Sequence, residues 1–187
     1  MLDPSVLVHE KALCESQDIG PGTRIWAFAH IMEGARVGRE CNVGDHVFIE
    51  SGAVVGDRVT IKNAVLLWDK VVIEDDVFLG PSAVFTNDLT PRAEIKKGPD
   101  QLAPTVVQRG ASIGANATIV CGITIGSYAF VGAGAVVVGD VPSYALMVGN
   151  PARRLGWACE CGEQLPESLQ CSCTRSYEPD DGLLKRK

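Results

Sequence analysis

Residues 37–60 read VGRECN VGDHVF IESGAV VGDRVT, four groups of six that each begin with a branched aliphatic residue. The spacing extends in both directions: every sixth residue from Leu7 to Phe85 is apolar, and the count resumes from Val107 to Val137. An α-helix cannot keep a six-residue repeat on one face, and an ordinary strand alternates with a period of two. The repeat predicts a solenoid of short strands whose aliphatic side chains point inward.

Glycines and small residues keep the same frame. Of the 20 glycines, eight directly follow the repeated aliphatic residue and six more stand three residues after it. Glycine is favoured where the backbone turns tightly or takes a positive φ. Each hexad should therefore contribute a short strand and a tight turn, with two side chains facing the interior. An antiparallel β-sandwich is the alternative, but it does not explain so many hexads in one register.

The overall composition excludes several functional classes. The 187 residues are 46% hydrophobic, which is enough for a buried core, and the formal net charge of −6 is opposite in sign to that of most nucleic-acid binders. No apolar run approaches the ~20 residues of a membrane helix, and the N-terminus lacks the features of a signal peptide. We expect a cytoplasmic protein that binds neither nucleic acid nor a membrane.

The repeat is interrupted once and then ends. Residues 86–106 contain three prolines, several charged residues and no hexad, so they are predicted to form a long loop inserted into the solenoid. Long irregular excursions from a rigid scaffold usually carry function, although a passive surface loop is the alternative. Residues 1–155 are expected to form the repeat domain and residues 156–187 a C-terminal tail.

The seven cysteines are an odd number in a chain without an export signal, which favours reduced thiols or a metal over disulfides. Four of them form two Cys-x-Cys pairs in the tail, Cys159 with Cys161 and Cys171 with Cys173. Four thiolates suit tetrahedral zinc, although each pair is one residue shorter than the usual Cys-x-x-Cys. A structural zinc and metal-free thiols both remain open.

The hexads IGPGTR, VGRECN, VGDHVF, VGDRVT, IGANAT and VGAGAV resemble those of the left-handed parallel β-helix acyltransferases, over about residues 5–155. In that family three hexads make one triangular coil of about 18 residues. The resemblance implies an all-β fold, a left-handed parallel β-helix with one long loop insertion and a small Cys-containing tail. It also implies acetyl-CoA as cosubstrate, bound in the groove between adjacent β-helices of a homotrimer.

The segments RIWAFAHI, FLGPSAVFTNDLTPR and YALMVGNPARRLGW resemble a narrower branch. Its members N-acetylate the 3-amino group of UDP- or dTDP-linked sugars for bacterial surface polysaccharides such as the lipopolysaccharide O-antigen. By this resemblance, the nucleotide-sugar would contact Phe85, Asn87, Arg92 and Lys97. Arg92 and Lys97 also make chemical sense on their own, since a diphosphate needs fixed cations.

Stacked coils of about 18 residues would place Glu15, Glu33, Ser51, Asp69 and Asn87 in one column. Asp69 and Asn87 would then lie on adjacent coils, ~4.8 Å apart in the strand-spacing direction and beside the insertion. We interpret them as the catalytic pair that orients the sugar amine toward the thioester. The alternative is a simple ladder of polar turn residues.

The cosubstrate side of the site has four candidate residues. In the light of the resemblance, the turn at Gly132 and Ala133 is a plausible source of a backbone N–H for the oxyanion of the tetrahedral intermediate. Arg153 and Arg154 follow the GNPA motif and are candidates for the CoA phosphates. Ordinary solvated charge is the alternative for the two arginines.

His30 falls in an outward column with Ala12, Phe48, Leu66 and Val84. An apolar outward column needs cover, so this face is predicted to be a subunit interface. His30 is then either an interface residue or a general base. A neutral sugar amine can attack a thioester without such a base.

Two other functions are alternatives for this sequence. The first is an O-acetyltransferase of the same fold, which a required histidine base would favour. The second is a non-enzymatic metal-binding scaffold of the γ-carbonic-anhydrase type. That type needs histidines around adjacent coils, and the scattered His9, His30 and His46 do not supply them.

Overall fold

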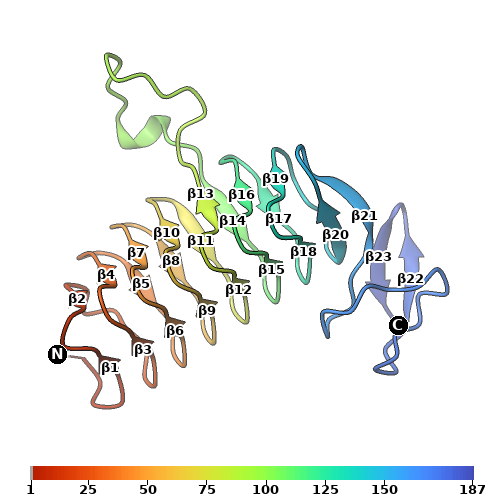
Figure 1. Cartoon of the computed structure of the whole chain (residues 1–187), viewed down its shortest axis with the longest axis horizontal. Helices are drawn as coiled ribbons and strands as arrows, with labels where there is room; N and C mark the ends of the chain where they lie inside the picture. The colour runs from red at the N-terminus through yellow and green to blue at the C-terminus, as the bar shows by residue number, and fades with distance from the viewer. Residues whose placement is uncertain (1) are drawn as a thin grey trace.

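The computed structural model describes residues 2–187 and is a three-sided parallel β-helix with a projecting loop and a separate C-terminal hairpin (Figure 1). Most strands contain two residues, and along the regular coils a strand pairs with the third strand after it, as β3, β6 and β9 do. The predicted fold class is confirmed. Within the described residues 2–187, no helix is both long enough and apolar enough to cross a membrane.

The strands form three long sheets, here called sheets A, B and C. Sheet A contains β1 (Leu7–Val8), β3 (Arg24–Ile25), β6 (Asn42–Val43), β9 (Thr60–Ile61), β12 (Phe78–Leu79), β15 (Ser112–Ile113), β18 (Phe130–Val131), β20 (Ala145–Val148) and β21 (Arg153–Trp157). Sheet B contains β2 (Leu13–Cys14), β4 (His30–Ile31), β7 (Phe48–Ile49), β10 (Leu66–Leu67), β13 (Val84–Phe85), β16 (Thr118–Ile119) and β19 (Val136–Val137). Sheet C contains β5 (Arg36–Val37), β8 (Val54–Val55), β11 (Val71–Ile73), β14 (Thr105–Val107) and β17 (Thr124–Ile125).

The core is the stack of inward side chains that the hexads predict. Ile31, Ile49 and Leu67 follow one another along sheet B and have no solvent exposure. The second inward position is held by small residues such as Ala35 and Ala53, which are also fully buried and leave room at the corners. Each buried Ile, Leu or Val stabilises the fold by roughly 1.5–3 kcal/mol, so the stack is the main source of stability.

The coils approach so closely at their corners that glycine is required there. A Cβ atom built at Gly56 would lie 2.5 Å from Oδ1 of Asp75 and 2.8 Å from the backbone nitrogen of the same residue. Real Cβ contacts are not that short, so the next coil would have to move. The glycine that follows the aliphatic residue in a hexad therefore sets the distance between coils.

The predicted frame is wrong by one residue in the first coil. Val8 pairs with Ile25 and Cys14 with Ile31, 17 residues apart, whereas Ile25 and Val43 of the next coils are 18 apart. Leu7 and Leu13 consequently face outward, with 46% and 53% of their surface exposed. Because both residues of β1 are apolar, the sequence alone does not reveal which of them faces the core.

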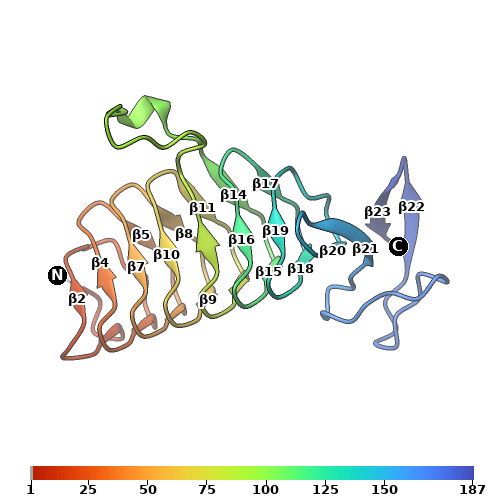
Figure 2. The same ribbon diagram turned by 45° about the horizontal axis from the view of Figure 1, so that its top comes forward.

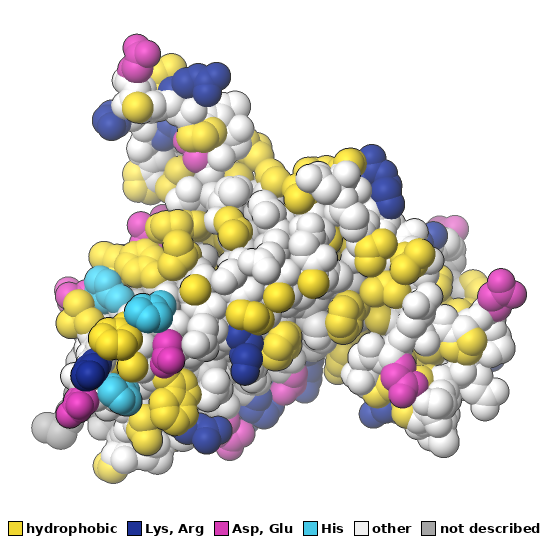
Figure 3. Space-filling model, in the orientation of Figure 1, with side chains coloured by type: hydrophobic (Ala, Val, Ile, Leu, Met, Phe, Trp, Pro, Cys, Tyr) yellow, Lys and Arg dark blue, Asp and Glu magenta, His cyan; other side chains and the backbone are white. Residues whose placement is uncertain are grey.

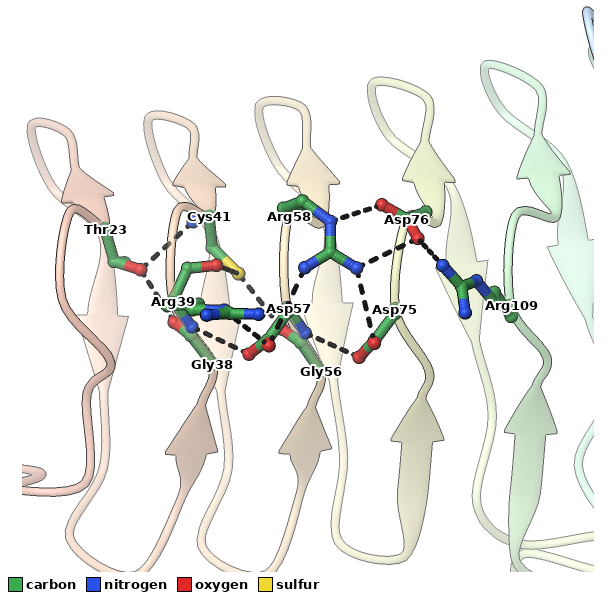
Figure 4. Close-up of polar contacts among 10 residues, drawn as sticks. All are labelled: Thr23, Gly38, Arg39, Cys41, Gly56, Asp57, Arg58, Asp75, Asp76 and Arg109. Carbon is green, nitrogen blue, oxygen red and sulfur yellow. Dashed lines mark hydrogen bonds and ion pairs between the residues drawn. The ribbon is translucent and has the colours of Figure 1, made fainter.

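A row of ion pairs, here called the charged ladder, connects successive coils at the turns that follow the strands of sheet C (Figure 4). The Arg39 guanidinium lies 2.9 Å from Oδ2 of Asp57, and Nε of Arg58 lies 2.6 Å from Oδ1 of Asp76. A second cation, Arg109, lies 3.0 Å from the other oxygen of Asp76. The hydrogen bond from Arg58 holds the pKa of the Asp76 carboxyl below its ordinary value. The ladder therefore ties consecutive coils together on the outside.

The substitution Asp76→Asn tests this ladder. We expect the free energy of unfolding at pH 7 to fall by about 1 kcal/mol. The effect is this small because the ion pairs are partly exposed to solvent, which weakens them. A carboxyl whose pKa is depressed in the folded state contributes stability above its unfolded pKa of about 4, and that contribution is lost as the pH falls through the folded value. Urea unfolding of both proteins should show the difference at pH 7 and a smaller difference at pH 3. An equal difference in unfolding free energy at both pH values would show that the ion pairs of Asp76 are not its cause.

The chain leaves the β-helix at its C-terminal end. β20 is the last parallel strand of sheet A, and β21 returns beside it in the antiparallel direction. Beyond it, β22 (Tyr177–Asp180) and β23 (Leu183–Arg186) form a hairpin with its own small apolar cluster. Figure 2 shows this tail beyond the last coil.

Candidate functional site

The insertion leaves the β-helix at the turn that follows sheet B. β13 ends at Phe85 and β14 begins at Thr105, and the residues between them rise from one corner of the solenoid (Figures 1 and 2). The loop contains a single turn of 3₁₀ helix, η1 (Pro99–Gln101). The corner from which it rises also carries the predicted catalytic pair, so the loop and the pair form one region of the surface.

The base of the loop is fixed by hydrogen bonds to the β-helix. The amide of Ala103 donates to the carbonyl of Asn87 over 3.0 Å, which closes the loop where it leaves the coils. Nζ of Lys70 donates to the carbonyls of Pro99 and Leu102. Sequence reasoning missed Lys70, because a lysine in a turn gives no sign of a partner some thirty residues later along the chain.

Lys97 and Arg92 have different surroundings in the loop. Nζ of Lys97 contacts the Asp88 carboxylate and lies 2.8 Å from Oγ1 of Thr90. This contact lowers the pKa of the Asp88 carboxyl. The Lys97 charge is therefore already paired within the loop and stabilises its conformation. Arg92 is exposed and, within residues 2–187, has no carboxylate partner. Of the two predicted diphosphate ligands, Arg92 is therefore the one available to an anion.

Asp69 and Asn87 occupy equivalent turn positions on neighbouring coils, each two residues beyond its strand in sheet B, and both are half-buried. The backbone N–H of Asp69 donates to the Glu50 carboxylate over 2.7 Å, which fixes the turn. Gly52, with φ of +87°, leaves room for the Asp69 carboxylate, because any Cβ there would collide with it. Glu15 does not belong to this column, because of the one-residue shift in the first coil.

Phe85 does not lie where a ligand could touch its ring. Its side chain faces the core and is 2% exposed, and only its carbonyl reaches outward, where it accepts a 2.8 Å hydrogen bond from Nε1 of Trp68. The ring is therefore closed to a nucleotide-sugar, and the predicted contact of Phe85 could be made only by its backbone. The hexad frame itself places Phe85 inward.

The outward face of sheet B carries a row of mostly apolar side chains that are exposed or partly exposed, here called the sheet B face. It contains Leu13, His30, Phe48, Leu66 and Val84. Leu13 stands where the frame had placed Ala12, again because of the shift in the first coil. Leu66 is 39% and Val84 48% exposed, and Figure 3 shows apolar side chains and the histidines gathered toward the N-terminal coils.

His30 has defined partners on this face. Its Nε2 lies 3.1 Å from Oε2 of Glu15, and the Phe48 ring packs against it edge-on with centroids 5.4 Å apart. The neighbouring Trp68 packs on the other side of Phe48. These contacts hold the imidazole in the apolar row, away from Asp69 and Asn87 at the turn.

The turn at Gly132 offers one free backbone donor. The Gly132 N–H already donates to the Met147 carbonyl over 2.8 Å, so it is not available to an oxyanion. Ala133 is exposed, and no acceptor within residues 2–187 takes its N–H. Arg153 pairs with Val148, which packs over Gly132, and so lies beside this turn. Ala133 and Arg153 thus form one local group.

Arg154 belongs to the tail. Its guanidinium lies 4.3 Å from the centre of the Trp157 ring and donates to the carbonyl of Gly182 over 3.4 Å. These contacts give it a structural role that the sequence does not reveal. Arg154 remains exposed, but its guanidinium already interacts with the Trp157 ring and the Gly182 carbonyl.

A single chain does not bring the two halves of the predicted site together. Asp69, Asn87 and the loop lie at the corner that follows sheet B, whereas Ala133 follows sheet A and Arg153 lies beside it near the C-terminal end of the solenoid. The width of sheet B separates these two corners (Figure 2). The arrangement can hold a polar substrate at one corner and a cosubstrate at the other.

Comparison with known proteins places these features in a family. Residues 18–51 match the family model of bacterial transferase hexapeptides (six repeats), and residues 104–138 match the hexapeptide repeat of succinyl-transferases. The dTDP-3-amino-3,6-dideoxy-α-D-galactopyranose 3-N-acetyltransferase of Aneurinibacillus thermoaerophilus is 50% identical over 182 residues, covering 96% of this chain and 94% of that protein.

Two solved structures share the fold. The hexapeptide-repeat acetyltransferase VCA0836 of Vibrio cholerae, complexed with acetyl coenzyme A, is 29% identical, has a TM-score of 0.58 and covers 66% of this chain and 70% of its own. The acetyltransferase domain of PglB from Neisseria gonorrhoeae, also complexed with acetyl coenzyme A, is 23% identical with a TM-score of 0.50, covers 82% of this chain and 56% of its own, and shows the fold alone. On the full-length match, the chain belongs to the family of hexapeptide-repeat sugar 3-N-acetyltransferases that includes the Aneurinibacillus enzyme.

Proposed function

We propose that this protein transfers the acetyl group of acetyl-CoA to the 3-amino group of a dTDP-linked 3-amino-3,6-dideoxyhexose. The observation that carries this proposal is the 50% identity to a protein of that activity, over 96% of the chain, so that both the β-helix and nearly all of the loop and tail are matched. The sequence alone left UDP and dTDP open, and the relative favours dTDP. A role in surface polysaccharide synthesis and the expected cytoplasmic location belong to the same proposal.

Asp69 and Asn87 are proposed to position the attacking amine. The Asp69 carboxylate and the side-chain carbonyl of Asn87 each accept a hydrogen bond from one N–H group of the neutral amine. These two bonds direct the nitrogen lone pair toward the thioester carbon. The new C–N bond forms first and gives a tetrahedral intermediate, whose collapse breaks the C–S bond, and CoA leaves with the proton that the nitrogen gives up. This step needs no histidine, since a sugar amine is a nucleophile in its neutral form.

Binding of the cosubstrate is assigned to the corner at Ala133. Its free N–H is suited to donate to the oxyanion of the tetrahedral intermediate, which develops negative charge on the former thioester oxygen. Arg153 beside it would hold a CoA phosphate, and Arg92 in the loop would hold the diphosphate of the sugar nucleotide. Gly132 supports the Ala133 turn through its backbone bond to Met147. Lys97 supports the loop through its ion pair with Asp88, whereas Arg154 is held by the tail.

The proposed active unit is a homotrimer with its sites between chains. Two observations support it: the two corners lie apart in one chain, and the sheet B face leaves Leu66 and Val84 partly exposed. Packing this face against a neighbouring chain would cover the apolar row. The same packing would bring the Ala133 corner of one chain toward the loop corner of the next.

His30→Ala tests the interface role of His30. We expect weaker assembly, seen as a rise of about tenfold or more in the dissociation constant of the oligomer, because an outward ring that packs edge-on against Phe48 is removed from the proposed interface. At protein concentrations that restore the oligomer, kcat should stay within about threefold of wild type. Analytical ultracentrifugation and steady-state rates measure both. An intact oligomer without activity would instead assign His30 as the general base.

The proposed substrate is tested by CoA release across a panel of nucleotide-sugars. Thiol release should be fastest with dTDP-3-amino-3,6-dideoxygalactose, slower with the UDP-linked 3-amino sugar and absent with the 3-hydroxy analogue. Absence of release with every 3-amino sugar would overturn the proposed function. Release with the 3-hydroxy analogue would favour the O-acetyltransferase alternative.

A further inference from the structure

The four cysteines of the tail meet at one point, although two pairs ten residues apart supply them. The Sγ atoms of Cys159, Cys161, Cys171 and Cys173 all lie within 4.8 Å of one another. Two of these separations, Cys159 to Cys173 and Cys161 to Cys171, are 3.5 Å. Four sulfurs bound at ~2.3 Å around a tetrahedral zinc would be about 3.8 Å apart. The sulfurs therefore already outline a cage of the size that zinc needs.

The two pairs sit on matching turns, here called the cysteine knuckles, residues 159–163 and 171–175. In both knuckles the amide of the first residue donates to the carbonyl of the last over 2.8 Å. In both, the fourth residue donates back to the first, over 2.8 Å from Gly162 and 3.0 Å from Thr174. Gly162 has φ of 93° and Thr174 of 75°. The same geometry thus recurs after 12 residues, although a positive φ is unfavourable for a β-branched residue such as Thr174.

The flanking chain repeats with the knuckles. Leu165 donates to the Trp157 carbonyl over 2.8 Å, and 12 residues later Tyr177 donates to the Leu169 carbonyl over 2.9 Å. Two equivalent hairpins therefore face each other and present two sulfurs each. A pair of facing Cys-bearing knuckles is the usual architecture of a structural four-cysteine zinc site.

Burial and charge also favour an ion. Cys159 and Cys171 are 2% and 4% exposed, and in the tail's own cluster only Leu165, Tyr177 and Leu184 are buried with them. So small a core usually needs a metal or a covalent link to stay folded. Four thiolates and one zinc carry a net charge of −2, and Nη1 of Arg175 lies 3.3 Å from the Cys173 sulfur, where it would offset part of that charge.

We propose that Cys159, Cys161, Cys171 and Cys173 bind one zinc ion that holds the C-terminal tail folded against the last coil of the β-helix. Four protein ligands leave no open position, so the site is structural. Binding replaces the four S–H protons by one Zn²⁺, and no electrons are transferred. This inference does not depend on the proposed acetyl transfer.

The metal would act on the β-helix through Tyr177. The Tyr177 hydroxyl lies 3.1 Å from the Cys159 sulfur and accepts the Glu160 N–H over 3.0 Å. Its ring packs edge-on against Tyr144, and Tyr144 stacks on Tyr128 of the preceding coil. A zinc ion that fixes the first knuckle therefore also fixes this row of tyrosines at the end of the solenoid.

Metal content and thiol count test the proposal on the whole chain. Protein purified without chelator should contain one zinc per chain by elemental analysis. After denaturation with chelator it should give all seven thiols. The double variant Cys159→Ser/Cys171→Ser should lose at least nine-tenths of the zinc, whereas the control Cys14→Ser should keep it. Removal of zinc from wild type should open the tail to trypsin at Arg175 and leave the far-ultraviolet signal of the β-helix unchanged.

Three results would overturn it. One is less than a tenth of a zinc per chain after reduction and incubation with zinc. Another is equal zinc in the double variant and the Cys14→Ser control. The third is a count of three thiols in denatured wild type, which would mean two disulfides between the facing sulfurs instead of a metal. The wild-type measurements do not depend on whether the variants fold.

Discussion

Replacing Asn87 with alanine is expected to lower kcat by about 100-fold or more, while the KM for acetyl-CoA stays within about twofold. The side-chain carbonyl is proposed to accept one N–H of the amine, and without it the lone pair is no longer directed at the thioester. The substitution should not disturb the loop, since the bond from Ala103 is made to the backbone carbonyl of residue 87. Steady-state rates in both substrates measure the effect.

Asn87→Asp is the matched control for this experiment. It keeps an accepting oxygen at the same position, so it should retain more of the activity than the alanine variant, with the same far-ultraviolet spectrum. If Asn87→Ala turned over at a rate close to that of wild type, the catalytic assignment would be lost and the column of Ser51, Asp69 and Asn87 would be a structural ladder.

The substitution Leu66→Glu is expected to separate the chains and reduce activity to about 1% or less. Leu66 lies in the middle of the sheet B face, between Phe48 and Val84 on the neighbouring strands. In the proposed trimer a carboxylate there would be buried against apolar groups without a partner, which costs several kcal/mol for each chain. Light scattering coupled to size exclusion should report a monomer that keeps its β-sheet spectrum.

Leu183→Glu is the control for the charge and for the lost leucine. Leu183 is 52% exposed and lies on the tail hairpin, outside the sheet B face. This variant should keep both the oligomer and the activity. An intact trimer in Leu66→Glu would show that another face makes the interface. A fully active Leu66→Glu monomer would show that one chain alone holds a complete site.

The solenoid could be predicted from the sequence because its signal is repeated many times. Ile31, Ile49 and Leu67 stack because each is six residues from the next aliphatic residue and 18 from its neighbour on the adjacent coil. The first coil is one residue shorter than the others, and the repeat does not reveal this because both residues that could face the core are apolar. That is why Leu7 and Val8 exchange roles without any trace in the repeat.

The site was less predictable because its contacts depend on the loop. Asn87 could be placed beside Asp69 from the coil spacing alone, since both belong to the periodic frame. Lys97 and Lys70 lie in or against the aperiodic segment, where nothing in the sequence pairs a cation with Asp88 or with the carbonyl of Pro99. The tail lies between these two cases: the cysteine spacing predicted four candidate ligands, but only the two matching knuckles show that the short Cys-x-Cys pairs bring their sulfurs together.

The most direct test of the central claim is the position of the transferred acetyl group. The protein should be incubated with dTDP-3-amino-3,6-dideoxygalactose and acetyl-CoA labelled with ¹³C in the carbonyl, and the product examined by NMR. The proposed reaction predicts an amide carbonyl coupled to the proton at C3 of the sugar, with one CoA released for each amide formed. A labelled ester on a sugar hydroxyl, or unchanged sugar after prolonged incubation, would contradict it.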